Sequence, residues 1–219
     1  MKNILNSHRI YFGIYAIFFI LASIILLLSD KQSIHLFFNG YTTPLLNGFY
    51  YYMTHVGDGL TLLAVGLLLL CISYRWTLQI ALSGILSGLI AQLLKKVVFG
   101  PTPRPSAYFE KLGIQLTYIE GVELHAAYSF PSGHTTAVFA LMTSLMLMFN
   151  KKKMELPLFI LALLTGFSRI YLSQHFLADV LAGSFIGVSV SVLVYYGLNH
   201  GSIAKHPKLD QSLITLLKK

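Results

Sequence analysis

Six apolar stretches run through this chain of 219 residues, and they constrain its fold more than any other feature. A bilayer core requires about 20 mainly apolar residues per helix, and the six stretches meet or approach that length. They cover residues 11–28, 58–73, 76–98, 135–149, 156–172 and 176–198. Charged residues make up only 11% of the chain, whereas a soluble domain carries about 25%. The sequence therefore predicts an all-α, polytopic membrane protein with six transmembrane helices in a single domain, residues 1–219.

The distribution of Lys and Arg predicts the orientation of these helices. Six spans place both termini on one side, and ten of the 16 Lys and Arg residues fall on that side. Since loops rich in Lys and Arg stay in the cytoplasm, we expect cytoplasmic termini, including a short basic tail at about 199–219, in a multi-pass protein of the cell inner membrane. This bias accounts for the formal net charge of +8. We therefore expect the bilayer as a partner and no nucleic acid, while the oligomeric state stays open.

Two segments between the spans lie on the opposite, outer side in this topology. Residues 32–47 mix apolar and polar side chains and favour a short amphipathic helix along the interface. The one long loop covers about 100–130, and Pro101, Pro103 and Pro105 argue against regular helix at its start. Loops of this length are usually functional or disordered.

Polar residues that could carry chemistry gather where the last two apolar stretches meet. Ser168 and Arg169 end one stretch, and His175 and Asp179 open the next. Ionisable residues at membrane depth indicate a functional site by default. Because His175 and Asp179 are four residues apart, they share one helix face, where the carboxylate can orient the imidazole.

The predicted topology brings two further polar groups to the same outer face. Lys95 and Lys96 end the third stretch, with Arg104 shortly after, and Ser132, Gly133 and His134 open the fourth. Converging cations favour a polyanion between them, and guanidinium groups match phosphate oxygens. A helix that starts at Ser132 also directs its N–H groups toward an anion. One histidine could attack phosphorus while the other protonates the leaving oxygen, a route that needs no metal or other cofactor.

At these residues the chain resembles the type 2 phosphatidic acid phosphatase superfamily, bacterial membrane lipid phosphatase branch. The family pattern is Lys-x6-Arg-Pro, then Pro-Ser-Gly-His, then Ser-Arg-x5-His-x3-Asp, and the second and third blocks match at every fixed position. The first block departs, because seven residues separate Lys96 from Arg104 and eight separate Lys95 from it. We favour Lys96 and keep Lys95 open.

The resemblance implies roles for the matching residues. His175 is the nucleophile, Asp179 orients it and His134 is the general acid. The implied phosphate-binding set is Lys96, Arg104, Ser132, Gly133 and Arg169. The function implied is hydrolysis of a lipid phosphomonoester or diphosphate through a phosphohistidine, without metal. Candidate substrates are phosphatidylglycerol phosphate, phosphatidate, undecaprenyl diphosphate and lipid A phosphates, and the site would face the periplasm or exterior.

Other interpretations remain. A lipid phosphotransferase could use the same site, and a transporter would also carry intramembrane charges, although usually spread through the midplane. An intramembrane serine protease could use Ser132, but the excess of cations suits phosphate better. Ser168 belongs to the motif without an assigned chemistry. His55 and Asp58 could border the site or select a head group, although a turn closed by an Asx hydrogen bond is the favoured interpretation.

Overall fold

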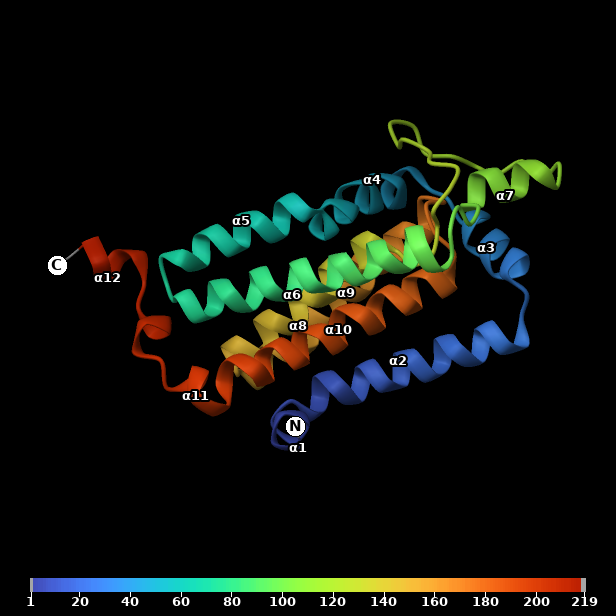
Figure 1. Cartoon of the computed structure of the whole chain (residues 1–219). Helices are drawn as coiled ribbons and strands as arrows, with labels where there is room; N and C mark the ends of the chain where they lie inside the picture. Colours follow the sequence, from blue (N-terminus) through green and yellow to red (C-terminus); the bar gives the residue numbers. More distant parts are fainter. Residues whose placement is uncertain (1, 218–219) are drawn as a thin grey trace.

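The computed structural model describes residues 2–217, and all regular elements in this range are helical (Figure 1). The long helices are α2 (Arg9–Leu28), α5 (Gly59–Leu70), α6 (Tyr74–Leu93), α8 (Gly133–Phe149), α9 (Lys152–Tyr171) and α10 (Leu177–Asn199). The shorter ones are α1 (Lys2–Ser7), α3 (Lys31–Asn39), α4 (Pro44–Met53), α7 (Pro105–Lys111), α11 (Gly201–Ala204) and α12 (Leu213–Leu217). A 3₁₀ turn, η1 (Thr54–Gly57), follows α4, a π-helical turn, η2 (Leu94–Val98), ends α6, and a second 3₁₀ turn, η3 (Pro207–Asp210), lies near the C-terminus.

Each of the six predicted stretches is a helix, which confirms the all-α class. Within residues 2–217, four helical segments are long and apolar enough to cross a membrane: α2, α6 continued through η2, α9 and α10. The segments Pro44–Gly57 and Gly59–Leu70 are bent by 55° and make a fifth if they form one span. Helix α8 is apolar but has only 17 residues. The structure therefore provides four or five candidate spans.

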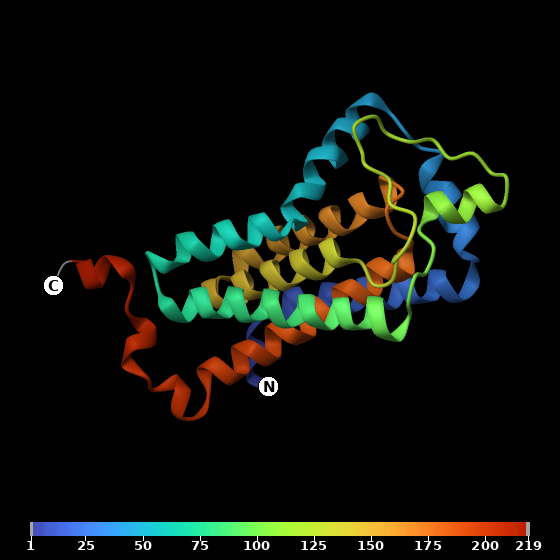
Figure 2. The same cartoon turned by 45° about the horizontal axis from the view of Figure 1, so that its top comes forward.

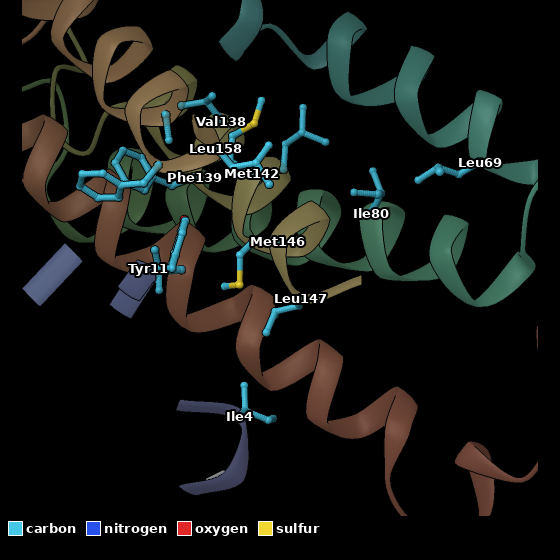
Figure 3. Close-up of a cluster of buried hydrophobic side chains, with 14 residues drawn as sticks. Ile4, Tyr11, Leu69, Ile80, Val138, Phe139, Met142, Met146, Leu147 and Leu158 are labelled. Carbon is cyan, nitrogen blue, oxygen red and sulfur yellow. The ribbon is translucent and has the colours of Figure 1, made fainter. Parts of the chain in front are cut away.

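Helix α8 lies at the centre of the bundle and packs against α6, α9 and α10. Its side chains Val138, Phe139 and Ala140 are fully buried, and Figure 3 shows Phe139 and Val138 among the core residues. Two glycines of α10 allow the close contact: a Cβ on Gly183 would lie 2.6 Å from Ser132 O, and one on Gly187 would lie 2.5 Å from Thr136 O. The N-terminus of α8 is thus held directly against α10.

One end of the bundle is covered by α3, α4, α7 and the chain that follows α7 (Figures 1 and 2). The start of the long loop, residues 100–104, is not helical, as expected. Pro105 itself differs from the expectation, because it is the first residue of α7, where its missing N–H costs nothing. The predicted amphipathic helix is α3, which ends at Asn39, but His35 and Asn39 are buried rather than at the interface. Both side chains contact Ser173 Oγ, at 3.1 and 3.3 Å.

Candidate active site

The three polar segments singled out from the sequence meet at this covered end of the bundle. The end of α6, the start of α8 and the loop between α9 and α10 lie there together, as the green and orange ribbons of Figures 1 and 2 show. Helices α6, α8 and α10 contact one another along their length, so the segments lie side by side. The packing of these helices therefore gathers residues that are up to 84 positions apart, from Lys95 to Asp179.

The loop that carries His175 is fixed by its own backbone. The N–H groups of Gln174 and His175 both donate to Arg169 O, at 2.9 and 3.0 Å. Ser173 adopts a left-handed conformation with φ 53°, which few non-glycine residues do. His35 and Asn39 hold its hydroxyl, so α3 stabilises this tight turn. His175 is thereby held in a buried position.

Asp179 contacts the imidazole of His175, but the expected shared helix face was wrong, because α10 begins at Leu177 and His175 lies in the loop before it. The Oδ2 atom of Asp179 lies 3.3 Å from His175 Nδ1 and also accepts from Phe176 N–H at 2.9 Å. The Ser129 hydroxyl donates to the same oxygen at 2.5 Å. Three partners therefore fix the carboxylate, and Nε2 of His175 is the ring atom directed away from it. Sequence reasoning missed Ser129, because nothing in its neighbourhood signals a partner 50 residues away.

Burial decides the protonation state of His175. Desolvation lowers the pKa of this imidazole to about 3, since the favourable effect of Asp179 is smaller and Arg169 and Arg104 add repulsion. The ring is therefore neutral at physiological pH, which is the form with a lone pair available for attack.

Two arginines meet at Gln174, next to His175. Arg104 Nη1 donates to Gln174 Oε1 at 3.2 Å, and Arg169 Nη2 lies 3.5 Å from the same oxygen. Arg169 Nη1 donates to the Thr54 hydroxyl, while its Nε is buried without a hydrogen-bond partner among residues 2–217. Burial lowers the pKa of Arg104, which still stays charged. A buried donor without a partner is costly, and the oxygen of an anion would satisfy it.

The structure brings Lys95 rather than Lys96 to these arginines, so our choice of Lys96 needs correction. Lys95 is buried within electrostatic reach of Arg104, Arg169 and Asp179, whereas Lys96 is exposed. The physical reason is helical phase. The buried positions of α6 include Ser87 and Ala91, and Lys95 continues this row at a spacing of four residues. Lys96, the next residue of the π-helical turn η2, falls outside this buried row and is exposed.

The serines of the two motifs have different surroundings. Ser132 is the N-cap of α8, where its Oγ accepts from the Thr135 hydroxyl at 2.9 Å, and its N–H donates to Asp179 O. A Cβ built on Gly133 would meet no atom within 4 Å, so there is open space in front of this helix start. Ser168 donates to Thr165 O inside α9 at 2.6 Å, a contact that stabilises the helix end and does not point into that space.

His134 is held by Asp58, and this corrects the favoured interpretation of the Asp58 turn. Asp58 is the N-cap of α5, yet its side chain makes no capping hydrogen bond. Its Oδ1 lies 2.6 Å from His134 Nε2, and its Oδ2 lies 2.8 Å from His55 Nδ1. All three side chains line a cavity of about 260 Å³, together with Arg169 and Gln174. The site thus holds two histidine–carboxylate pairs.

The fold and the site define a membrane-type helical bundle with a cationic pocket and two histidine–carboxylate pairs at one end. The model of the PAP2 superfamily matches residues 76–200, which include every motif residue from Lys95 to Asp179. The chain belongs to this superfamily, and the expected resemblance is confirmed.

The relatives in this superfamily include named lipid phosphatases. Undecaprenyl-diphosphatase BcrC of Bacillus subtilis (strain 168) is 32% identical over 140 residues, which are 64% of this chain and 67% of the relative. Lipid A 4'-phosphatase of Porphyromonas gingivalis is 28% identical over 177 residues, 77% of this chain and 73% of the relative. The crystal structure of Aquifex aeolicus LpxE superposes with a TM-score of 0.66 at 26% identity and covers 74% of this chain and 93% of its own. These relatives support assignment of the chain as a phosphatase.

Proposed function

We propose that this protein is a membrane lipid phosphatase that hydrolyses a phosphomonoester or diphosphate through a phosphohistidine. One observation carries the proposal: the neutral, buried His175 is anchored by Asp179 beside the cations Lys95, Arg104 and Arg169. Three cations would repel one another without a counter-charge, and a phosphate supplies it. A transporter pathway is disfavoured, since these charges gather at one end of the bundle.

In the proposed mechanism, Nε2 of His175 attacks phosphorus and the bond to the leaving oxygen breaks. His134 gives its proton to that oxygen, and Asp179 stabilises the positive charge that develops on the ring of His175. Lys95, Arg104, Arg169, Ser132 and the Gly133 N–H hold the three phosphoryl oxygens. A water molecule, deprotonated by His134, then attacks the phosphohistidine and releases inorganic phosphate. The positive side chains of Lys95, Arg104 and Arg169 neutralise the negative charge of the phosphate, so the proposed reaction needs no metal.

The lipid nature of the substrate is supported by the location of the site. The pocket lies at helix ends, where a lipid head group could enter while its chains stay in the bilayer. A second cavity of about 290 Å³ supports this, because Leu26, Phe99 and Phe130 line it and it reaches Asp179. The named relatives suggest undecaprenyl diphosphate or a lipid A phosphate, and phosphatidylglycerol phosphate and phosphatidate remain candidates.

The proposal includes six spans with the site on the outer side of the inner membrane. Helix α8 would complete the set, since 17 residues extend over roughly 25 Å, close to the hydrocarbon thickness of about 30 Å. The ten Lys and Arg at the opposite side support cytoplasmic termini.

The test is phosphate release by the purified full chain in detergent, with the four candidate lipids and a soluble phosphate ester. We expect release from at least one lipid, at an efficiency at least about tenfold above the soluble ester, equivalent to about 1.4 kcal/mol. EDTA should leave most of the activity. A strict magnesium requirement would contradict the mechanism, and transfer of phosphate to a second lipid without release would favour the phosphotransferase.

A further inference from the structure

Asp58 stands at the bend between η1 and α5 and behaves unlike an ordinary residue at the start of a helix. An N-cap aspartate usually accepts hydrogen bonds from the first turn, and losing such a bond costs about 0.5–2 kcal/mol. Asp30, the N-cap of α3, does this with Gln32 N–H and Ser33 N–H, both at 2.9 Å. The side chain of Asp58 makes no capping hydrogen bond to α5, and its two carboxylate oxygens contact His134 and His55 instead.

The position of Asp58 is fixed by tight packing on the start of α8. A Cβ added to Gly57 would lie 2.9 Å from His134 O and 3.2 Å from Thr165 Cγ2. The backbone before Asp58 therefore rests directly on the backbone of His134. This leaves little freedom for the distance between the carboxylate and the imidazole.

The charges around His134 come from four directions. Asp58 and His55 face it from the bend, Arg169 faces it from α9, and Arg104 acts from the loop before α7. The long loop adds Glu123 and His125 to the same cavity, and Tyr51 of α4 also lines it. Burial, more than the two arginines, disfavours a positive charge on His134, and Asp58, whose Oδ1 lies 2.6 Å from Nε2, is the group that favours one.

We propose that Asp58 is the positioning residue of His134, braced by His55, and that it holds this imidazole in the orientation needed to donate to the leaving oxygen and stabilises the positive charge that the ring carries before it donates. The inference rests on the proposed function, in which His134 is the general acid. The contact with Asp58 occupies Nε2, so Nδ1 is the ring atom that gives its proton to the leaving oxygen. Each histidine of the site then has its own carboxylate: Asp179 for the attacking ring and Asp58 for the donating ring.

The experiment compares two leaving groups in mixed micelles, an alkyl phosphate and 4-nitrophenyl phosphate. An alkoxide must be protonated as it leaves, whereas nitrophenolate departs without a proton. The rate of leaving-group release is measured in a single turnover, because this step precedes the attack of water that both substrates share. For Asp58→Asn, which keeps the shape and removes the charge, we expect this rate to fall about tenfold or more with the alkyl phosphate and less than about threefold with the nitrophenyl ester. Substrate affinity should change little for either substrate, and the alkaline limb of the alkyl release rate should move to lower pH. His55→Ala should show the same selectivity with a smaller loss.

Asp30→Asn is the matched control, because it removes an N-cap carboxylate that does cap its helix. It should leave the ratio of the two activities unchanged, and the thermal stability should change little, because Asn caps a helix about as well as Asp. An equal loss for Asp58→Asn on both substrates, or no loss on either, would overturn the inference. His134→Ala distinguishes a failure of the role proposed for Asp58 from a failure of the proposed mechanism. If it is selective for the alkyl phosphate while Asp58→Asn is not, only the role of Asp58 fails; if His134→Ala is not selective, or His175→Ala stays active, the proposed mechanism itself fails.

Discussion

At the scale of single residues, the environment of His175 makes the sharpest prediction. The ring is buried, neutral and anchored at Nδ1, which leaves only Nε2 for attack. His175→Ala should abolish turnover and also abolish an acid-labile phosphoenzyme, which rapid quenching with radiolabelled substrate detects in the wild type. The control is His206→Ala, an exposed histidine of the C-terminal segment, which should keep full activity. Phosphate release by a well-folded His175→Ala protein would reject the nucleophile.

The two adjacent lysines offer a second test at this scale. Lys95 is buried within electrostatic reach of the arginines, whereas Lys96 is exposed. A hydrogen bond from a charged donor contributes about 1.5–3 kcal/mol, so Lys95→Ala should reduce kcat/KM by about 10- to 100-fold. Lys96→Ala should change it less than threefold, within about 0.6 kcal/mol. A larger loss in Lys96→Ala than in Lys95→Ala would return the assignment to the one favoured by motif spacing.

At the scale of elements, the contact between α8 and α10 depends on glycine. A Cβ on Gly187 would lie 2.5 Å from Thr136 O and 2.8 Å from Ala140 N, both backbone atoms that cannot move independently. Gly187→Ala should therefore destabilise the protein by about 1–3 kcal/mol or more. Gly197→Ala, in the same helix, meets no atom within 4 Å and should stabilise it by up to about 1 kcal/mol. Thermal unfolding in detergent measures both, and equal melting temperatures would show that the helices are farther apart.

Helix α3 makes stability depend on pH through His35. Burial lowers the pKa of His35 to about 4, because its ring packs against Phe109 and Phe176. In the unfolded chain a histidine titrates near 6.5, so between about pH 6.5 and 4 the unfolded state binds more protons. Stability is therefore lost as the pH falls through this window, at up to about 1.4 kcal/mol per pH unit for one such group.

The measurement is the melting temperature of the detergent-solubilised protein between pH 7 and 4.5. His35→Gln, which can still contact Ser173 Oγ but cannot titrate, should show a weaker decline than the wild type. His206→Gln, on an exposed residue, should decline as the wild type does. A decline in His35→Gln equal to that of the wild type would mean that the loss arises elsewhere, for example at His175.

At the scale of the whole molecule, the orientation of the protein in the membrane decides which leaflet supplies the lipid substrate. A cysteine at Glu120, in the exposed part of the long loop, should react with an impermeant thiol reagent in intact cells, after outer-membrane permeabilisation if there is one. The background must lack Cys71, which is exposed. A cysteine at Lys151, between α8 and α9, should react only after the inner membrane is opened. The reverse pattern would place the site at the cytoplasmic leaflet.

The amino-acid sequence alone determined the helical class, the places of the six apolar helices and the motif residues. The length of each apolar stretch and the order of the motifs are properties of the chain that require no tertiary information. The spacing also predicted that His175 and Asp179 would meet, but the shared helix face was the wrong reason, because α10 begins at Leu177 and His175 reaches Asp179 from the loop before it.

Only the tertiary structure decided which polar side chains complete the site. Lys95 replaced Lys96 because the buried face of α6 is set by its neighbours α8 and α10, and motif spacing cannot reveal that phase. Ser129 reaches Asp179, and Asp58 reaches His134, across 50 and 76 residues of sequence. Such contacts form where helices happen to pack, so local sequence carries no signal for them. For the same reason the sequence could indicate a turn at His55 and Asp58, whereas the contact of Asp58 with His134 requires the packing of η1 against α8.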